Sequence, residues 1–594
     1  MISYKSEFDK EKAFFVKENN YLVNKMQFEL LPGNPIAFWI SEKMAESFVK
    51  GKPVAEYSDS FQGIITGDNN RFLRFWAEVD INKIAFRQEK MSNIDLSKTY
   101  WIPYNKGGEF RKWYGVQDYV IYWKNGPDDK TRGRKGFSKY YLKEYLAWSY
   151  TVGDTIATRY YPFGFLWDVR GSGLMDTTNT MLYLEGLISS KVGIELLRVN
   201  NSTPSCQVEN ILQLPIIIDN KDKVDEIVKI NNNISKEDWD SFEASWDFVK
   251  HPLIRWSKEI NNETGAPILL KQYYDQNVEI KCPLELCYSL WQRECQDRFN
   301  KLKTNEEELN QIFIDIYGLQ DELTPTVEER DVTIRKADSK RDIGSLISYA
   351  VGCMFGRYSL DVEGLAYAGG EWDSSKYKTF IPDDDNCIPI TDEEHFDDHI
   401  VGRFCEFLKV VFGEESLEEN LNYVAQALGN KGNTSREIIR NYFLNDFFKD
   451  HCSTYSVTGS GKRPIYWLFD AGKQNGFKCL IYMHRYDKDT VNRVRSEYLK
   501  KMQDAIEGAL KNAEYAVDNS SSAVDRAAAT RKRDKYIKQL NEIRAYYPAL
   551  SHMALQRVEI DLDDGVKTNY AKFQGIETVD ENGKKQKVDL LAKI

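Results

Sequence analysis

The chain has 594 residues, of which 42% are hydrophobic and 13% aromatic, enough for several folded domains with ordinary apolar cores. It has no apolar run near the roughly 18 residues of a membrane span, and its first residues are charged, so we expect a soluble, cytoplasmic protein that does not bind membranes. Nine scattered cysteines without a CxxC pair indicate reduced thiols. The net charge of −11 does not by itself indicate a nucleic-acid binder.

The first 60 residues mix short helical patterns with a turn at residues 32–35 (PGNP), where prolines disfavour helix. We interpret them as a linker with helical segments. From residue 61 to 220, short aromatic and β-branched runs alternate with glycine-rich turns, which is typical of strands. Helices are expected within it at residues 138–151 and 179–199. The sequence therefore predicts a strand-rich domain, hereafter the β-rich region (residues 61–220).

Helical patterns dominate the next part of the chain, residues 221–350. The run at 284–317 has apolar residues at helical spacing and contains no proline. Residues 351–490 have a mixed pattern, which predicts an α+β domain. That domain ends in two β-prone runs, 464–469 and 477–482, separated by a glycine-containing turn, so we expect a β-hairpin there.

Residues 491–550 give the clearest helical pattern in the chain. Apolar residues recur every three or four positions on either side of a polar break at 518–522, which predicts an antiparallel helical hairpin. Residues 551–594 form a short tail, in which we expect a few strands and fraying at GKKQK (583–587). Together these elements predict the α+β class.

Positive charge is concentrated locally although the whole chain is acidic. Residues 101–140 carry nine Lys or Arg and four Asp or Glu, a net +5, whereas residues 361–420 carry four and 17, a net −13. A local basic surface can hold phosphate on an acidic protein. A solvated surface of mixed charge would have the same composition.

Two motifs at the start of the β-rich region suit nucleic acid. FQGIITGDNNRFLRFW (61–76) has two glycines that permit close backbone approach, and Arg71 and Arg74 flank an apolar ladder. Residues 101–123 hold eight aromatic residues interleaved with cations, which can contact phosphates or base edges while the rings stack. Without a ligand, residues 61–76 would be a turn before an amphipathic element, and residues 101–123 would be a sheet with an aromatic core. A basic loop follows at 124–139. The predicted DNA-binding residues are Arg71, Arg74, Lys106, Arg111, Lys112, Arg132, Arg134 and Lys135.

Other patterns that suggest catalysis or metal binding are incomplete. GSGK (459–462) lacks the spacing of a phosphate loop. His395 and His399 lie four apart among carboxylates, which is more typical of a solvated acidic helix than of a metal site. GSG (171–173) lacks the strand and acidic partner of a methyl-donor loop. We therefore predict no catalytic and no metal-binding residue.

Seven motifs, taken in order, resemble the C-terminal part of PglX, the family of adenine-specific DNA methyltransferases of BREX phage-defence systems, which is related to type IIG restriction-modification enzymes. They span most of the chain and are PGNPIAFWI (32–40), FQGIITGDNNRFLRFW (61–76), KGGEFRKWYG (106–115), DWDSFEASWDF (238–248), SLISYAVGCMFGRY (345–358), KRPIYW (462–467) and YMHRYD (482–487).

The resemblance implies site-specific adenine N6 methylation, with S-adenosylmethionine as cofactor, for an intact enzyme. It implies that residues 61–220 are a target-recognition domain and that residues 1–60 would follow a methyltransferase domain. The family's Asn-Pro-Pro-Tyr and its donor-binding glycine loop are absent, and no Pro-Pro dipeptide occurs. We therefore expect this chain to bind no cofactor of its own and not to methylate DNA alone. The implied partners are double-stranded DNA, a methyltransferase half if the enzyme is split, and other BREX subunits.

A second hypothesis is a partner-binding scaffold of the defence complex without DNA affinity of its own. The acidic stretch 361–420 and the helical hairpin motivate it, since both are plausible partner surfaces.

Overall fold

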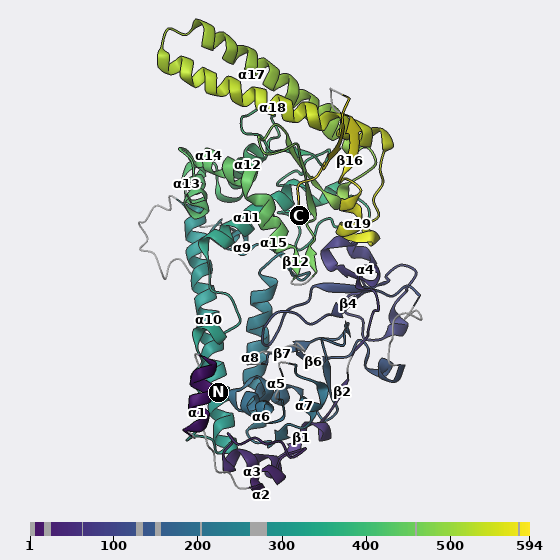
Figure 1. Ribbon diagram of the computed structural model, residues 1–594, viewed down its shortest axis with the longest axis vertical. Coiled ribbons are helices and arrows are strands. Elements are labelled where there is room, and N and C mark those ends of the chain that lie inside the picture. The colour runs from purple at the N-terminus through teal and green to yellow at the C-terminus, as the bar shows by residue number, and fades with distance from the viewer. Residues whose placement is uncertain are drawn as a thin grey trace.

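The computed structural model describes residues 6–16, 25–61, 63–125, 135–148, 156–201, 203, 205–261, 282–429, 431–457, 460–579 and 583–594. The molecule is elongated (Figure 1), with the β-rich region in its lower half, helices above, and a helical hairpin that projects at the upper end. Helices and small sheets alternate along the chain, which confirms the α+β class.

Two four-stranded sheets build the β-rich region, in the orders β2-β9-β6-β7 and β3-β5-β4-β8. All neighbouring strands are antiparallel except β4 and β8. Every residue of β4 and β6 is buried, because both faces of these strands are covered. The strands are β2 (Ser58–Phe61), β3 (Leu73–Phe75), β4 (Trp101–Asn105), β5 (Tyr119–Tyr122), β6 (Tyr145–Trp148), β7 (Thr158–Tyr161), β8 (Leu166–Trp167) and β9 (Gly173–Asp176).

Helices pack against these sheets at the lower end of the molecule (Figure 1). Their core includes Leu184, Val228 and Phe313, and a two-stranded ladder of β1 and β10 closes it. These elements are α1 (Glu7–Phe15), α2 (Lys25–Glu29), α3 (Glu42–Lys50), β1 (Lys52–Pro53), α5 (Met181–Ser189), α6 (Lys191–Asn200), α7 (Val208–Leu212), β10 (Pro215–Ile216) and α8 (Lys221–Asp240). The short helix α4 (Asn69–Phe72) lies higher, and its Phe72 packs in the core of the β3-β5-β4-β8 sheet. Helices α5 and α6 confirm the helical pattern expected at 179–199.

Helix α10 (Pro283–Tyr317) connects the lower and upper halves and confirms the helix expected at 284–317. Proline opens it, where the missing N–H costs nothing, and Gly318 ends it in the left-handed conformation at φ 68°. Trp291 on its early turns lies in the central core, and Phe313 near its end lies in the lower one. The helix is therefore part of both cores.

The upper half shares its core with the β-rich region. Trp76 and Trp101 from below pack in the same cluster as Tyr349 and Phe404 from above. The upper elements are α9 (Pro252–Asn261), α11 (Ser339–Met354), β11 (Ile388–Pro389), α12 (Ile400–Phe412), α13 (Leu417–Leu428), α14 (Ser435–Asn445), α15 (Phe447–Thr454), β12 (Ser456–Val457), β13 (Gly461–Lys462), β14 (Tyr466–Asp470) and β15 (Lys478–Tyr482). Strands β14 and β15 form the expected hairpin, with Trp467 opposite Ile481, and β11 extends that sheet.

The projecting arm in Figure 1 confirms the predicted helical hairpin. It starts with α16 (Thr490–Arg493) and a π-helical turn, Val494–Leu499, then continues through α17 (Lys500–Asn519) and α18 (Ala523–Gln556). The tail adds α19 (Gly565–Ala571), β16 (Ile576–Val579) and β17 (Lys585–Val588). Fraying at GKKQK was a wrong expectation, because three of those residues lie in β17, paired with β16, and Leu590 and Leu591 beyond are buried.

Two expected helices are absent from the described residues. Within 138–151 the structure has the end of a 3₁₀ helix (Lys135–Tyr140) and strand β6, which pairs with β7 on one side and with β9 on the other. The segment around His395 is not helical, and His399 instead caps α12 by accepting the Gly402 N–H at 3.2 Å. All nine cysteines are free, as expected. Within the described part of the chain, no helix is both long and apolar enough to cross a membrane.

Candidate nucleic-acid interface

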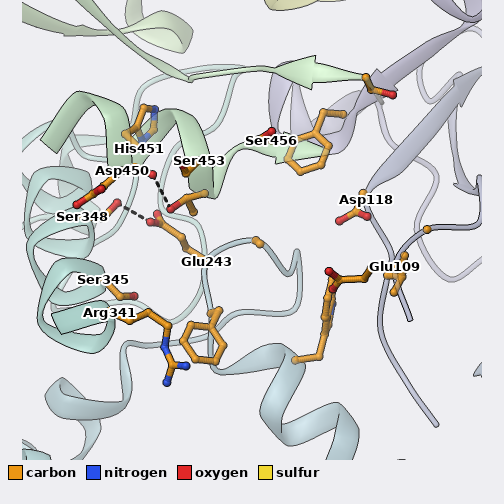
Figure 2. A pocket seen from close by; sticks show the side chains of 18 of the residues that line it. Glu109, Asp118, Glu243, Arg341, Ser345, Ser348, Asp450, His451, Ser453 and Ser456 are labelled. Atoms are coloured by element: carbon orange, nitrogen blue, oxygen red, sulfur yellow. Dashed lines mark hydrogen bonds between the residues drawn. The ribbon is translucent and has the colours of Figure 1, made fainter. Parts of the chain in front are cut away.

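A cleft of about 1180 Å³ lies between the β-rich region and the upper helices (Figure 2). The segment between β4 and β5 forms one wall, with Glu109 and Asp118, and helices α11 and α15 form the other. The loop after α8, which carries Glu243, lies between them. The volume is slightly above the roughly 300–1,000 Å³ of common small-molecule pockets.

Cations and carboxylates line the cleft in equal numbers. The cations are Lys106, Arg170, Arg335, Lys340 and Arg341, and the carboxylates are Glu109, Asp118, Glu243, Asp338 and Asp450. Arg335 and Arg341 lie against the ring of Phe242, with centroid distances of 4.3 and 5.3 Å. Arg170 and Lys340 are exposed. These two are therefore the cleft cations most open to a phosphate from solvent.

Arg170 and Lys340 were not among the DNA-binding residues predicted from the sequence. Lys340 belongs to RKADSKR (335–341), where four of seven residues are cations, a local signal that could have identified it. Arg170 stands alone in the sequence and reaches the cleft only because β8 pairs with β4. No sequence spacing predicts that approach.

Lys106 lies at the edge of the cleft, where it is held in an ion pair. Its Nζ is 2.5 Å from Oδ2 of Asp168, which also accepts the Tyr104 hydroxyl at 3.0 Å. Gly107 follows at φ 73°, and a side chain there would meet the Arg170 carbonyl oxygen 2.9 Å away. The close approach of these two loops therefore places Lys106 and Arg170 on the same wall.

Arg111 lies inside the protein, 3% exposed. Its guanidinium donates to Asp238 Oδ2 at 2.9 Å, to the Ser235 carbonyl at 3.0 Å and to the Tyr114 carbonyl at 2.7 Å. It also stacks over the Trp239 ring at 5.2 Å. The residue thus joins the β-rich region to the end of α8, and a base or phosphate could reach it only if this ion pair opened.

Lys112 has a similar buried position against α10. Its ammonium pairs with Glu306, whose other carboxylate oxygen accepts the Trp113 indole N–H at 2.7 Å. Both predicted cations of this motif therefore lie within joints between elements. Their contact with DNA remains a prediction, and their burial favours a structural role.

The 61–76 motif separates its two arginines. Asp68 caps α4 by accepting the Arg71 N–H at 3.1 Å, and the exposed Arg71 guanidinium lies 4.7 Å from the Phe72 ring centroid. Arg74 instead donates to the carbonyl oxygens of Asp563 at 2.9 Å and Asn70 at 2.6 Å. Arg74 therefore fastens the C-terminal tail to the β-rich region, whereas Arg71 is open to solvent.

The same tail contact includes a carboxylate with three donors. Asp563 accepts the Trp101 indole N–H at 3.0 Å, the Lys83 ammonium at 3.0 Å and the Tyr100 hydroxyl at 2.5 Å. Burial alone would raise the pKa of Asp563, but these hydrogen bonds hold that pKa below its usual range. The carboxylate is thus ionised and structural.

Of the basic loop, Arg132 and Arg134 lie outside the described residues. Lys135 begins the 3₁₀ helix Lys135–Tyr140, and its side chain is likewise outside the described part.

The upper wall of the cleft is a buried polar network (Figure 2). Glu243 accepts the Ser348 hydroxyl at 2.5 Å and the Tyr455 hydroxyl at 3.2 Å, and burial raises the pKa of Glu243. Arg357 is fully buried and donates to the Tyr482 hydroxyl at 3.0 Å. Its charge opposes the rise in the pKa of Glu243. Glu243 lines the cleft and Arg357 does not, and both side chains are buried.

His451, also in this wall, does not offer a catalytic base. Its Nε2 accepts the backbone N–H groups of Ile465 at 3.1 Å and Tyr466 at 3.0 Å. Burial lowers the pKa of His451 to about 3, so the ring is neutral at physiological pH. Among the described residues, no group of three or more His, Cys, Asp or Glu side chains could hold a metal ion. The Nε2 atom of His451 is therefore occupied by backbone donors, and this ring has a structural role.

The glycines at 171–173 do not fit a methyl-donor site. Ser172 is buried and donates to the Val169 carbonyl at 3.3 Å, and a side chain at Gly171 would meet Asn105. Gly173 lies in β9 opposite Phe61. These glycines permit close packing of strands and leave no cradle for a nucleoside.

No protein-family model matches this sequence. The chain is 40% identical to "Adenine-specific methyltransferase PglX" of Lacticaseibacillus casei (strain Zhang), over 97% of this chain and 47% of that protein. It is 32% identical to "Adenine-specific methyltransferase BrxX" of Escherichia coli O9:H4 (strain HS), over 94% of this chain and 46% of that protein.

The chain thus spans about half the length of the curated relatives it matches. The relationship extends over nearly the whole sequence, which supports the family resemblance of the seven motifs.

Proposed function

We propose that this chain provides DNA-sequence recognition for a site-specific adenine N6 methyltransferase of BREX type, used in phage defence and host-DNA marking. The proposal rests mainly on the comparison with two proteins named adenine-specific methyltransferases. Nearly all of this chain matches about half of each of them. The cleft beside the β-rich region supports the proposal, because its exposed cations Arg170 and Lys340 suit phosphate.

In this proposal the DNA backbone meets Arg71, Lys106, Arg170 and Lys340, and the basic loop adds Arg132, Arg134 and Lys135. Arg74, Arg111 and Lys112 act indirectly, because their ion pairs and hydrogen bonds hold the recognition surface in place. We infer that residues 61–220 are the target-recognition domain and that this chain corresponds to the C-terminal part of such an enzyme, as its seven motifs imply.

Methyl transfer would require the other half of such an enzyme. S-adenosylmethionine and the flipped adenine both need pockets, and the closely packed glycines at 171 and 173 leave no room for a methyl donor. Methyl donor labelled with tritium, mixed with duplex DNA and this chain alone, should give only background incorporation. Incorporation that is abolished by changes within this chain would contradict the proposal.

A gel-shift titration tests DNA binding directly. The complex with duplex DNA carrying the methylation site should weaken as salt rises, with a slope of about −0.9 in log affinity against log salt for each phosphate contacted. A duplex with a scrambled site is the control. Binding that does not depend on salt, or no binding even when a methyltransferase half is added, would contradict the proposal.

The alternative is a scaffold that binds other defence subunits and has no DNA affinity of its own. The projecting hairpin of α17 and α18 favours it, because an arm outside the main body is accessible to partners (Figure 1). Co-purification with other BREX subunits, together with no retention on DNA at low salt, would support this alternative.

A further inference from the structure

An apolar surface occupies the lower end of the molecule, around the turn that precedes α3 (Figure 1). Residues 30–40 (LLPGNPIAFWI) contain no charged side chain. Within this segment Ile36 is 75% exposed and Trp39 is 52% exposed. Loops in water are ordinarily polar, so an uncharged segment with exposed large side chains points to a covered surface.

The segment is fixed to the core, so the exposed side chains are held in place. Leu31, Ala37 and Ile40 are buried in the lower core. The turn between them closes through an Asn34 N–H to Leu31 carbonyl bond of 3.0 Å. The backbone is therefore held by its buried residues, and the exposed Ile36 and Trp39 form part of a preformed surface.

We propose that this apolar surface, made by residues 30–40, is the docking site for the methyltransferase half of the enzyme. The inference rests on the function proposed above. The matched relatives have about as much chain again beyond the region they share with this one, so a domain of comparable size is available to cover it. That half is the occupant, whether it is joined by a peptide bond or is a separate chain.

The chemistry of the surface fits this occupant better than it fits DNA. Exposed Trp and Phe are typical anchors at the centre of protein–protein interfaces, whereas a phosphate backbone requires cations, which residues 30–40 lack. A second copy of the chain is disfavoured because each copy carries a net charge of −11. Docking here leaves the cleft, which lies farther along the molecule, open to the duplex.

The test uses the full chain and a separately expressed probe, the half of the Lacticaseibacillus casei relative that this chain does not match. Isothermal calorimetry should detect a complex, and the double variant Ile36→Ser/Trp39→Ser should weaken it at least about tenfold, as expected for loss of an aromatic anchor. The double variant Tyr515→Ser/Leu555→Ser is the matched control. It removes side chains that are 71% and 80% exposed on the helical hairpin, and it should leave the affinity unchanged.

Three results would overturn the docking site. One is failure of the unchanged chain to bind the probe, another is equal binding by the Ile36→Ser/Trp39→Ser variant, and the third is dimerisation of the unchanged chain that this variant abolishes. Gel shifts of the same variants separate this proposal from the proposed function. The Ile36→Ser/Trp39→Ser variant should bind DNA as well as the unchanged chain does. If the unchanged chain binds the probe but does not bind DNA, the recognition role is refuted and the docking site is not.

Discussion

The cations of one short motif have two different environments. Arg111 and Lys112 are buried in ion pairs with α8 and α10, whereas Lys106, a few residues earlier, reaches the edge of the cleft beside the exposed Arg170. The same side-chain types therefore hold the β-rich region together in one place and face solvent in the other. Charge in a sequence motif locates a functional region, but burial decides which of its cations can meet a ligand.

The largest expected effect on stability comes from removing one of the buried cations. Arg111→Ala would leave the Asp238 carboxylate buried without its guanidinium, which typically costs about 3–5 kcal/mol in the free energy of unfolding. Urea unfolding followed by circular dichroism measures this. Lys340→Ala, at the exposed side of the cleft, is the matched control and should change the free energy by less than about 0.5 kcal/mol. Equal stability of the two variants would mean that Arg111 is not part of the joint.

The tail contact should respond next most strongly. Asp563→Ala removes the acceptor of Trp101, Lys83 and Tyr100, and hydrogen bonds to a charged group are worth about 1.5–3 kcal/mol. We expect the free energy of unfolding to fall by about 2 kcal/mol at pH 7. Because the pKa of Asp563 is lowered in the folded protein, this contribution is present above the unfolded value near 4 and is lost as pH falls through the folded value.

Thermal melts at pH 7 and pH 3 of the unchanged protein and Asp563→Ala measure that dependence. The difference between the two proteins should shrink at the lower pH. A difference that stays constant across this range would show that the carboxylate's ionisation does not matter to the tail contact.

Local patterns in the sequence were sufficient to predict several elements. The 284–317 helix, the 464–482 hairpin and the helical hairpin each follow from the spacing of neighbouring apolar residues. The prediction of a helix at 138–151 was wrong. The composition of Tyr145–Trp148 suits a helix or a strand, and pairing with β7 and β9 makes it a strand. Tertiary pairing overrides local preference in such short apolar runs.

The candidate site was harder to predict than the fold. The sequence identified the motif that contains Arg111 and Lys112, yet their partners Asp238 and Glu306 lie 127 and 194 residues away. Arg170 enters the cleft through pairing of β8 with β4, which is also a long-range contact. Separating interior from exposed cations therefore required the tertiary structure.

Changes of the exposed cations in the cleft should affect DNA affinity without affecting folding. Arg170→Ala and Lys340→Ala should each weaken DNA binding several-fold and make the slope of log affinity against log salt about 0.9 less negative. Thermal stability should stay the same, because both side chains are exposed. Fluorescence anisotropy at several salt concentrations measures the slope. Lys98→Ala, an exposed lysine away from the cleft, is the control. Unchanged slopes for both cleft variants would exclude the cleft as the phosphate-binding surface.

The smallest expected effect concerns Asp118, on the cleft wall. Burial and then the nearby Glu109 raise the pKa of Asp118 to about 7, while Arg159 opposes the shift. The carboxyl is therefore largely neutral at pH 6 and ionised at pH 8, where its charge would repel phosphate in the cleft. DNA affinity of the unchanged protein should fall by about twofold between these pH values, roughly 0.4 kcal/mol, as expected for one charge partly screened by solvent.

Asp118→Asn should remove this pH dependence while keeping the shape of the side chain. A raised carboxyl pKa also means that the folded state is favoured when the group is protonated, so this contribution to stability is present below about pH 4 and is lost as pH rises through 7. The Asn variant should therefore be the more stable protein at pH 8, with an advantage that disappears toward pH 4. Anisotropy titrations and thermal melts on the same samples measure the two effects. A variant that flattens the stability profile but leaves the DNA profile unchanged would place Asp118 in the fold and away from the bound duplex, and it would shift the recognition surface toward Arg71 and the basic loop.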